Sequence, residues 1–163
     1  MAKNKEEKTN VMRVLEQKKI AYTAHTYPHE EGVAVDGVTV AQSMGFDPTA
    51  VFKTLVARGA SKQYYIFDVP VAENLDLKKA AKAVGEKSIE MIHQKELLPL
   101  TGYVHGGCSP VGMKKMFPTV IDASAEDLET MIVSAGKIGY QVELSPRDLA
   151  ALVRAKFAEL IAE

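Results

Sequence analysis

The chain carries almost no excess charge of either sign. Its 20 Lys and Arg residues are balanced by 21 Asp and Glu residues, which leaves a formal net charge of −1 at pH 7. This balance excludes a protein that binds nucleic acid through an overall positive field, because such binding requires many cationic contacts with phosphates. Any RNA partner must therefore be held by a local basic patch or by a third protein.

Cysteine and long apolar runs are also scarce. The single cysteine, Cys108, excludes an internal disulfide and is typical of a reducing compartment. No apolar run approaches the roughly 18 residues of a membrane span, and the opening MAKNKEEK lacks the hydrophobic region of a signal peptide. We therefore expect a soluble, cytoplasmic protein without a membrane partner.

Several well-known catalytic and cofactor-binding motifs are missing as well. The sequence has no Walker loop, no GxGxxG after a strand and no GxSxG nucleophile elbow. The four histidines are dispersed, and His25 and His29 belong to a strand that runs into a proline-containing loop rather than to one helical face. We expect neither a metal site nor a cofactor.

Residues 101–115 stand out against these absences, because TGYVHGGCSPVGMKK contains four glycines, a serine–proline step and two lysines. Tyr103 and Val104, bracketed by glycines, predict a short strand that opens at Gly106 and Gly107. Paired glycines let the backbone approach a ligand closely and leave amide N–H groups unshielded, which suits a developing negative charge. A tight connection without chemistry is the alternative interpretation.

Three further residues are candidates for chemistry. Lys53 shares one face of a predicted strand, residues 51–57, with apolar side chains, so it either snorkels at the strand end or projects into a pocket. Ser109 precedes a proline, which biases it to extended geometry with its hydroxyl near the glycine-rich turn. Cys108 could act as a nucleophile only beside a base such as His105, and a small apolar filler is the alternative.

The apolar patterns predict strands interspersed with helices. The expected helices cover residues 11–19, 39–44 and 77–84, a helical turn that Pro99 ends, and a C-terminal helix that starts at Ser145 and includes Phe157, Leu160 and Ile161. The expected strands cover residues 20–27, 51–57, 63–69, 88–91, 119–121, 131–134 and 140–144. Asn10 is the expected N-cap of the first helix. Without a regular βαβ rhythm, this order predicts a mixed α/β domain over residues 10–163, preceded by a flexible segment, residues 1–9.

Five segments, in the same order, resemble the YbaK/EbsC family. They are residues 25–27 (HTY), 51–55 (VFKTL), 75–83 (LDLKKAAKA), 101–115 and 136–139 (GKIG). This family is related to the editing domain inserted in bacterial prolyl-tRNA synthetases, and the resemblance runs from about residue 11 to about residue 160. It implies a single domain whose mixed β-sheet forms a partly open barrel with surrounding helices. It also implies a freestanding deacylase that removes cysteine from Cys-tRNA(Pro), with Cys-tRNA(Cys) as a further candidate substrate, beside prolyl-tRNA synthetase.

The resemblance assigns catalytic and substrate-binding roles by position. Lys53 matches the family's essential lysine, and Tyr27 matches a tyrosine near the pocket. Gly106 and Gly107 match a glycine pair whose first member lines the site, and Ser109 falls in the same stretch. In this family, cleavage uses the substrate's own thiol, which attacks the ester carbonyl and leaves as a thiolactone. Such a site needs orientation and oxyanion stabilisation more than a protein nucleophile, so Lys53 would anchor the substrate while the amides of the glycine pair face the oxyanion.

One position departs from the family. Where relatives can carry an aspartate after the GKIG turn, this chain has Gln141, whose amide exchanges hydrogen bonds but holds no negative charge. Glu143, two residues further along the same strand face, could partly substitute for that aspartate.

A local group of lysines is the candidate contact for tRNA phosphates. Its members are Lys78, Lys79, Lys82, Lys114 and Lys115. Two rival interpretations remain open: an editing enzyme for another small amino acid such as alanine, and a non-catalytic adaptor that docks on a synthetase and has lost its chemistry at Gln141.

Overall fold

The computed structural model describes residues 8–162, so residues 1–7 of the predicted flexible segment lie outside the described residues. The helices are α1 (Asn10–Gln17), α2 (Gly37–Met44), α3 (Leu77–Val84), α4 (Gln94–Thr101) and α5 (Pro146–Val153), with short 3-10 helices at Pro48–Ala50 and Ala123–Asp127. The strands are β1 (Tyr22–Thr26), β2 (Phe52–Gly59), β3 (Tyr64–Pro70), β4 (Ile89–Met91), β5 (Thr119–Asp122), β6 (Met131–Ser134), β7 (Tyr140–Leu144) and β8 (Lys156–Ala158). Within residues 8–162, no helix is both long enough and apolar enough to cross a bilayer.

The strands form two sheets that meet without closing. Three strands, in the order β1-β7-β6, pair antiparallel, and five strands follow the order β4-β2-β3-β5-β8. In the larger sheet, β2 pairs antiparallel with β3 and β4, whereas β3-β5 and β5-β8 are parallel pairs. A single parallel bridge between Val51 and Ile132 joins the two sheets. This mixed, partly open arrangement confirms the predicted fold class.

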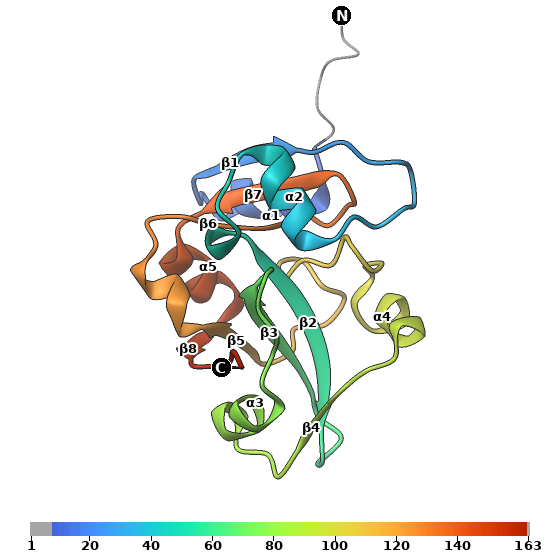
Figure 1. Cartoon of the computed structure of the whole chain (residues 1–163), viewed down its shortest axis with the longest axis vertical. Helices are drawn as coiled ribbons and strands as arrows, with labels where there is room; N and C mark the ends of the chain where they lie inside the picture. The colour runs from blue at the N-terminus through green and yellow to red at the C-terminus, as the bar shows by residue number, and fades with distance from the viewer. Residues whose placement is uncertain (1–7, 163) are drawn as a thin grey trace, which may run out of the picture.

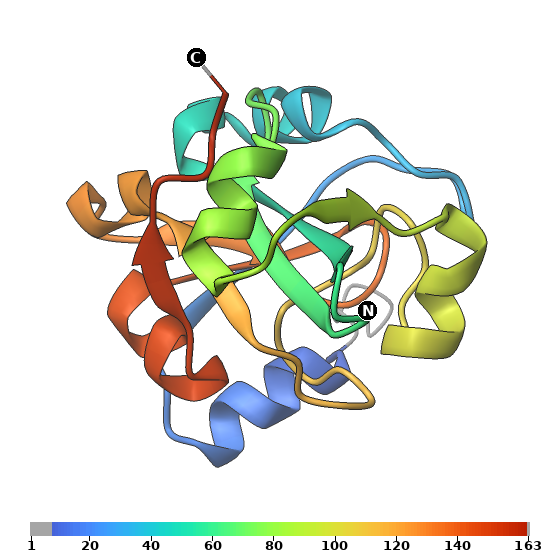
Figure 2. The ribbon, with the colours of Figure 1, turned by 90° about the horizontal axis from the view of Figure 1, so that it is seen from below.

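Figure 1 shows the three-stranded sheet, with α1 and α2, at one end of the molecule. The β2–β3 hairpin runs from that end to α3 and β4 at the other end, and α4 stands apart to one side (Figure 1). Seen from below, α5 and β8 lie beside each other on the opposite side from α4 (Figure 2). The largest core cluster packs α1 and α5 against the three-stranded sheet through Val11, Leu15, Val142 and Leu149, each 0% exposed.

Two local predictions about helix ends are wrong. The N-cap of α1 is Thr9 rather than Asn10, because the Thr9 hydroxyl accepts the Met12 N–H at 3.2 Å. Pro99 lies inside α4, which continues to Thr101 and ends at the left-handed residue Gly102. No strand forms at Tyr103–Val104, since the chain turns directly from Gly102 into the glycine-rich loop.

The predicted C-terminal helix is too long. It ends at Val153, because Arg154 adopts a left-handed conformation with φ 59° and the Ala155 N–H returns to the Ala150 carbonyl at 2.8 Å. The following Lys156–Ala158 forms β8 beside β5. The helix-like spacing of Phe157 and Leu160 therefore falls on a short, partly buried strand and the segment that follows it, an ambiguity that is inherent in short apolar runs.

Candidate functional site

A cavity of about 370 Å³ lies where the two sheets meet. The β4 strand covers β2 only at Ala57–Gly59, so the edge of β2 at residues 52–55 is open, and the cavity lies along this edge. Its wall is contributed by the residue that follows β1, by β2, β6 and β7, by the segment that enters α2 and the start of α2, and by the glycine-rich loop. The polar or glycine residues in that wall are Asp36, Gly37, Lys53, Thr54, His105, Gly106, Ser134 and Gln141, and Tyr27 adds a phenol.

Lys53 is the cation of the cavity. It is half-buried, and it projects from the open part of β2 that precedes the β4 pairing. Burial lowers the pKa of the Lys53 ammonium, and the nearby negative charge of Glu73 partly offsets this effect. A lysine that is partly desolvated beside a cavity suits electrostatic stabilisation of a bound anion or a developing oxyanion.

Tyr27 and Gln141 form the wall contributed by the three-stranded sheet. Tyr27 is 4% exposed, and burial raises the pKa of its phenol although a backbone hydrogen bond from Gly139 opposes the shift. Gln141 pairs with His25 of β1 and Ser134 of β6, and it is 6% exposed. Its Oε1 atom is buried without a hydrogen-bond donor, so a bound ligand that donates there would satisfy it.

Glu143 does not take the place of the missing aspartate. Its Oε1 pairs with His25 Nε2 at 2.8 Å, and its Oε2 accepts the Thr130 hydroxyl at 2.5 Å. The hydrogen bonds from Thr130 and His25 lower the pKa of Glu143, and the residue is not part of the cavity wall. The expectation that it could partly substitute for an acid at position 141 is therefore not supported, because both of its oxygens are engaged by His25 and Thr130 and it lies outside the cavity wall.

The two glycines of the pair have different environments. Gly106 lines the cavity with φ +90°, and a Cβ there would come within 2.7 Å of Ala34, so the close approach of these segments requires glycine. Gly107 lies behind it against the turn at residues 136–139, and its N–H donates to the Val104 carbonyl at 2.9 Å. The Gly107 amide is thus engaged, which leaves Gly106 as the member of the pair that can face a ligand.

Ser109 and Cys108 follow in the same loop. Ser109 is 0% exposed and outside the cavity wall, where its hydroxyl accepts the Val111 N–H at 3.2 Å and shapes the loop. Cys108 does line the cavity, but burial and the neighbouring acid Asp68 raise the pKa of its thiol to about 12. A thiol in this state is protonated at neutral pH and is a poor nucleophile.

The glycine-rich loop, the half-buried lysine and the mixed sheets point to one family. The aminoacyl-tRNA editing domain matches residues 32–152, which include all the cavity residues named above except Tyr27. The chain belongs to the aminoacyl-tRNA editing domain family.

Individual relatives agree with this assignment. The chain is 44% identical over 161 residues to EbsC of Enterococcus faecalis, which is named as a Cys-tRNA(Pro)/Cys-tRNA(Cys) deacylase, and the match covers 98% of both chains. It is 28% identical over 100 residues to a proline–tRNA ligase of Shouchella clausii, where it covers 61% of this chain and 17% of the ligase. A crystal structure titled as a trans-editing enzyme for prolyl tRNA synthetase superposes with a TM-score of 0.79 and 26% identity, over 94% of this chain and 95% of that one.

The editing domain brings further polar residues to the cavity, of which the sequence analysis considered only His105, as a base for Cys108. Asp36 caps α2, where its carboxylate accepts the Thr39 N–H at 3.1 Å and the Thr39 hydroxyl at 2.6 Å. His105 and Ser134 reach the wall from the glycine-rich loop and from β6. The capping pattern at Asp36 was readable in the sequence, but its position beside the cavity depends on how the loop at residues 28–36 folds over Gly106. Among residues 8–162, no cluster of three or more His, Cys, Asp or Glu side chains is placed to hold a metal ion.

The five candidate lysines of this editing domain do not form one patch. Lys78, Lys79 and Lys82 lie on α3, at the opposite end of the β2–β3 hairpin from the three-stranded sheet (Figure 1). The Lys79 ammonium donates to the Ile161 carbonyl at 2.9 Å and so ties α3 to the C-terminal segment. Lys114 and Lys115 lie on the loop that follows α4, and the Lys115 ammonium is 5.7 Å from the centre of the Phe117 ring.

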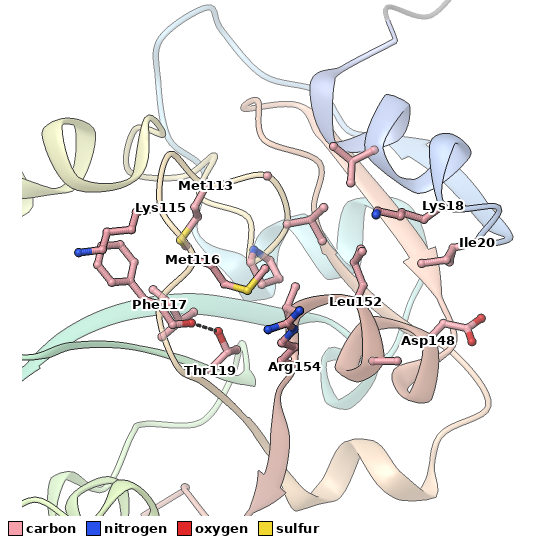
Figure 3. A pocket seen from close by; sticks show the side chains of 17 residues that line it. Lys18, Ile20, Met113, Lys115, Met116, Phe117, Thr119, Asp148, Leu152 and Arg154 are labelled. Carbon is pink, nitrogen blue, oxygen red and sulfur yellow. Dashed lines mark hydrogen bonds between the residues drawn. The ribbon is translucent and has the colours of Figure 1, made fainter.

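A second cavity, of about 590 Å³, lies on the outer side of the glycine-rich loop, between α1 and α5 (Figure 3). Its floor is apolar and includes Met113 and Leu152. Figure 3 shows Lys115 on one side, Lys18 on the other and Arg154 between them. Although this cavity is the larger of the two, it contains none of the residues predicted to be catalytic, so the first cavity remains the better candidate for the chemistry.

Proposed function

We propose that the protein is a trans-editing deacylase that removes cysteine from misacylated Cys-tRNA(Pro), with Cys-tRNA(Cys) as a second substrate to test. The observation that supports this most strongly is the cavity beside β2, where the half-buried Lys53 faces the same space as Gly106 and Gln141. The near-complete match to a relative named as such a deacylase supports the same substrate.

The chemistry that we propose uses the thiol of the esterified cysteine. Its sulfur attacks the ester carbonyl, a C–S bond forms, and the C–O bond to the ribose breaks. The thiol proton passes to the ribose oxygen, and the amino acid leaves as a four-membered thiolactone that water then opens. Lys53 and the Gly106 N–H would stabilise the negative charge that develops on the carbonyl oxygen, and the cavity would hold the thiol near the carbonyl.

The proposed partners are aminoacylated tRNA and prolyl-tRNA synthetase, and the proposed site of action is the cytoplasm, where charged tRNA is made and used. A deacylation assay with purified protein and Cys-tRNA(Pro), with and without the synthetase, tests the function directly. We expect the ester to be lost faster than in buffer. A rate equal to that in buffer from a folded protein would favour the adaptor interpretation.

Replacing Cys108 with serine is expected to leave kcat/KM for Cys-tRNA(Pro) within about threefold of the wild-type value. The pKa of this thiol is raised to about 12, mainly by burial, so a thiolate is not available at neutral pH. Steady-state kinetics of Cys108→Ser and iodoacetamide labelling of the wild-type protein at pH 7 check this expectation. Rapid labelling, or a loss of several orders of magnitude in rate, would point to a protein nucleophile instead.

Binding of free tRNA is expected to be weak and to depend only moderately on salt. With a net charge of −1, only local lysines can displace counterions, so the slope of log K against log salt should be a few units at most. Titrations between low and moderate salt measure this slope. A slope near those of strongly basic nucleic-acid binders would contradict the expectation.

Two double variants separate the two groups of candidate lysines. Lys114→Gln with Lys115→Gln removes charge beside the loop that forms the cavity, and Lys78→Gln with Lys82→Gln removes the same charge from α3. The group that contacts phosphates should reduce the salt slope by about one to two units when it is neutralised. The other pair serves as the matched control.

A further inference from the structure

The wall of the cavity includes two hydrogen-bond acceptors that come from different sheets. One is the Gln141 Oε1 atom on β7, which is buried and unpartnered. The other is the Thr54 hydroxyl on β2, whose acceptor character is fixed by a buried acid behind it. Neither Thr54 nor this acid belongs to the residues that the sequence singled out.

Asp68 is that acid, and it lies directly opposite Thr54 in the register of the β2–β3 pair. The Thr54 hydroxyl donates its proton to Asp68 Oδ1 at 2.5 Å. A hydroxyl has one proton, so while Thr54 donates it to Asp68 the remaining capacity of Thr54 toward the cavity is to accept. Asp68 thereby sets the direction of the Thr54 hydroxyl without touching the cavity itself.

The surroundings of Asp68 indicate a role other than stability. Its carboxyl is 0% exposed, and its second oxygen, Oδ2, has no hydrogen-bond partner. Burial raises the pKa of Asp68 to about 7, against the opposing effect of the Thr54 hydrogen bond. A buried carboxyl with an unsatisfied oxygen destabilises a fold relative to an apolar side chain of similar size. Its position under a cavity residue gives this cost a functional explanation.

The pattern of acceptors defines the chemical group that would fit. An ammonium group has three N–H donors, a positive charge and no acceptor, so it matches a cavity whose wall offers acceptors from two sheets. The carboxylate of Asp36, which also borders the cavity, adds negative potential there. Successive residues of a strand point to opposite faces, so Thr54 and Lys53 flank the open edge of β2 from opposite sides. A substrate ammonium can therefore lie beside Thr54 while Lys53 serves the carbonyl.

We propose that Thr54 and Gln141 bind the free α-ammonium group of the esterified amino acid, and that Asp68 is the positioning residue that keeps the Thr54 hydroxyl turned toward it as an acceptor. This inference rests on the proposed deacylase function. The enzyme then requires an unmodified amino group, which spares N-acylated esters such as peptidyl-tRNA from cleavage. The residues thus make the site specific for aminoacyl-tRNA rather than for any thiol-bearing ester.

The test compares Cys-tRNA(Pro) with N-acetyl-Cys-tRNA(Pro), each with its thiol free, and corrects both rates for spontaneous hydrolysis. Wild-type protein should cleave the N-acetyl ester at least 50-fold more slowly than the free-amino ester. A loss of this size is expected when a site built to hydrogen-bond a polar group meets a substrate that lacks that group. Thr54→Val should slow cleavage of the free-amino ester about tenfold or more with little effect on the N-acetyl ester, so the preference collapses. Thr54→Ser keeps the hydroxyl and should restore the preference, and Thr26→Val on the exposed face of β1 is the matched control.

Two variants of Asp68 separate positioning from stability. Asp68→Asn retains an oxygen that can accept from Thr54 and should retain the preference for the free amino group. Asp68→Leu should lose most of that preference while its melting temperature stays equal or rises, because a buried, unsatisfied carboxyl is removed. Unchanged preference in a folded Asp68→Leu protein would overturn the positioning role.

Binding of a non-cleavable analogue, cysteine joined by an amide to 3′-amino-3′-deoxyadenosine, keeps the inference testable if neither ester is cleaved. The free-amino analogue should bind at least tenfold more tightly than its N-acetyl form. Absence of cleavage together with this difference in affinity would refute the proposed function and retain the ammonium site. Equal cleavage of both esters, or equal affinity for both analogues, would refute the ammonium site.

Discussion

Replacing Lys53 with methionine is expected to lower kcat/KM for Cys-tRNA(Pro) roughly 10²–10³-fold, the loss typical of removing one preorganised electrostatic contact with a transition state. Methionine keeps an unbranched apolar stem of similar length, so the change removes the charge and little else. Lys53 and Gly106 line the same cavity beside β2, where we propose that the oxyanion develops.

The same substitution should not weaken the fold. Burial lowers the pKa of Lys53, which means that the folded protein disfavours the charged form relative to the unfolded chain. Removing that partly buried charge should leave the melting temperature unchanged or slightly higher. Lys87→Met, at an exposed site beyond α3, is the matched control and should keep full activity. Near-normal turnover by a folded Lys53→Met protein would show that Lys53 only snorkels to the surface.

The second large effect concerns which ester is cleaved. Cys-tRNA(Pro) should be deacylated more than 10³-fold faster than Ser-tRNA(Pro) or Ala-tRNA(Pro), because only the cysteinyl ester carries a thiol nucleophile. The fit of so small a side chain in a pocket discriminates by only about 1–3 kcal/mol. A thiol is a few per cent ionised at neutral pH, whereas a serine hydroxyl is almost wholly protonated and alanine has no nucleophile. A preference well beyond the range of pocket fit therefore indicates that the substrate thiol takes part in the reaction.

Product analysis checks the same point independently. Mass spectrometry of a rapid quench should detect the cysteine thiolactone, or its adduct with an added amine, before hydrolysis gives free cysteine. Equal rates on the cysteinyl and seryl esters would contradict the substrate-thiol mechanism. The reaction would then need an activated water, and Glu143, whose oxygens are bound by His25 and Thr130, is not available as its base.

Much of the site was predictable because it lies in short sequence motifs. Lys53 interrupts an apolar strand face, and Gly106 belongs to a glycine pair. Each can therefore be recognised from the neighbouring sequence without knowledge of the fold. Tyr27 and Gln141 were found through the resemblance to the YbaK/EbsC family, and both line the cavity. Gly107 and Ser109 came from the same stretch, but they lie behind the wall because one loop cannot turn every residue toward a ligand.

The rest of the site depends on contacts that no local pattern encodes. Thr54 and Asp68 meet only through the register of a hairpin, and a buried aspartate in an apolar strand gives no sign of which residue it faces. Strand β8 follows the left-handed Arg154 and pairs with β5, which lies more than thirty residues earlier in the chain. No local pattern encodes this pairing, so the apolar spacing of the segment predicts a helix instead. The second cavity is assembled from α1, α5 and the loop after α4, which are distant in sequence.

The most direct measurement is the deacylation of Cys-tRNA(Pro) by purified protein, under single-turnover conditions, beside Ala-tRNA(Pro) and the Lys53→Met variant. We expect rapid release of free tRNA(Pro) from the cysteinyl ester, a rate near that of buffer for the alanyl ester, and a loss of roughly 10²–10³-fold in the variant. Faster cleavage of the alanyl ester would show an editing enzyme with a different amino acid as its substrate. Loss of the cysteinyl ester no faster than in buffer, from a protein with an intact melting transition, would contradict the proposed activity.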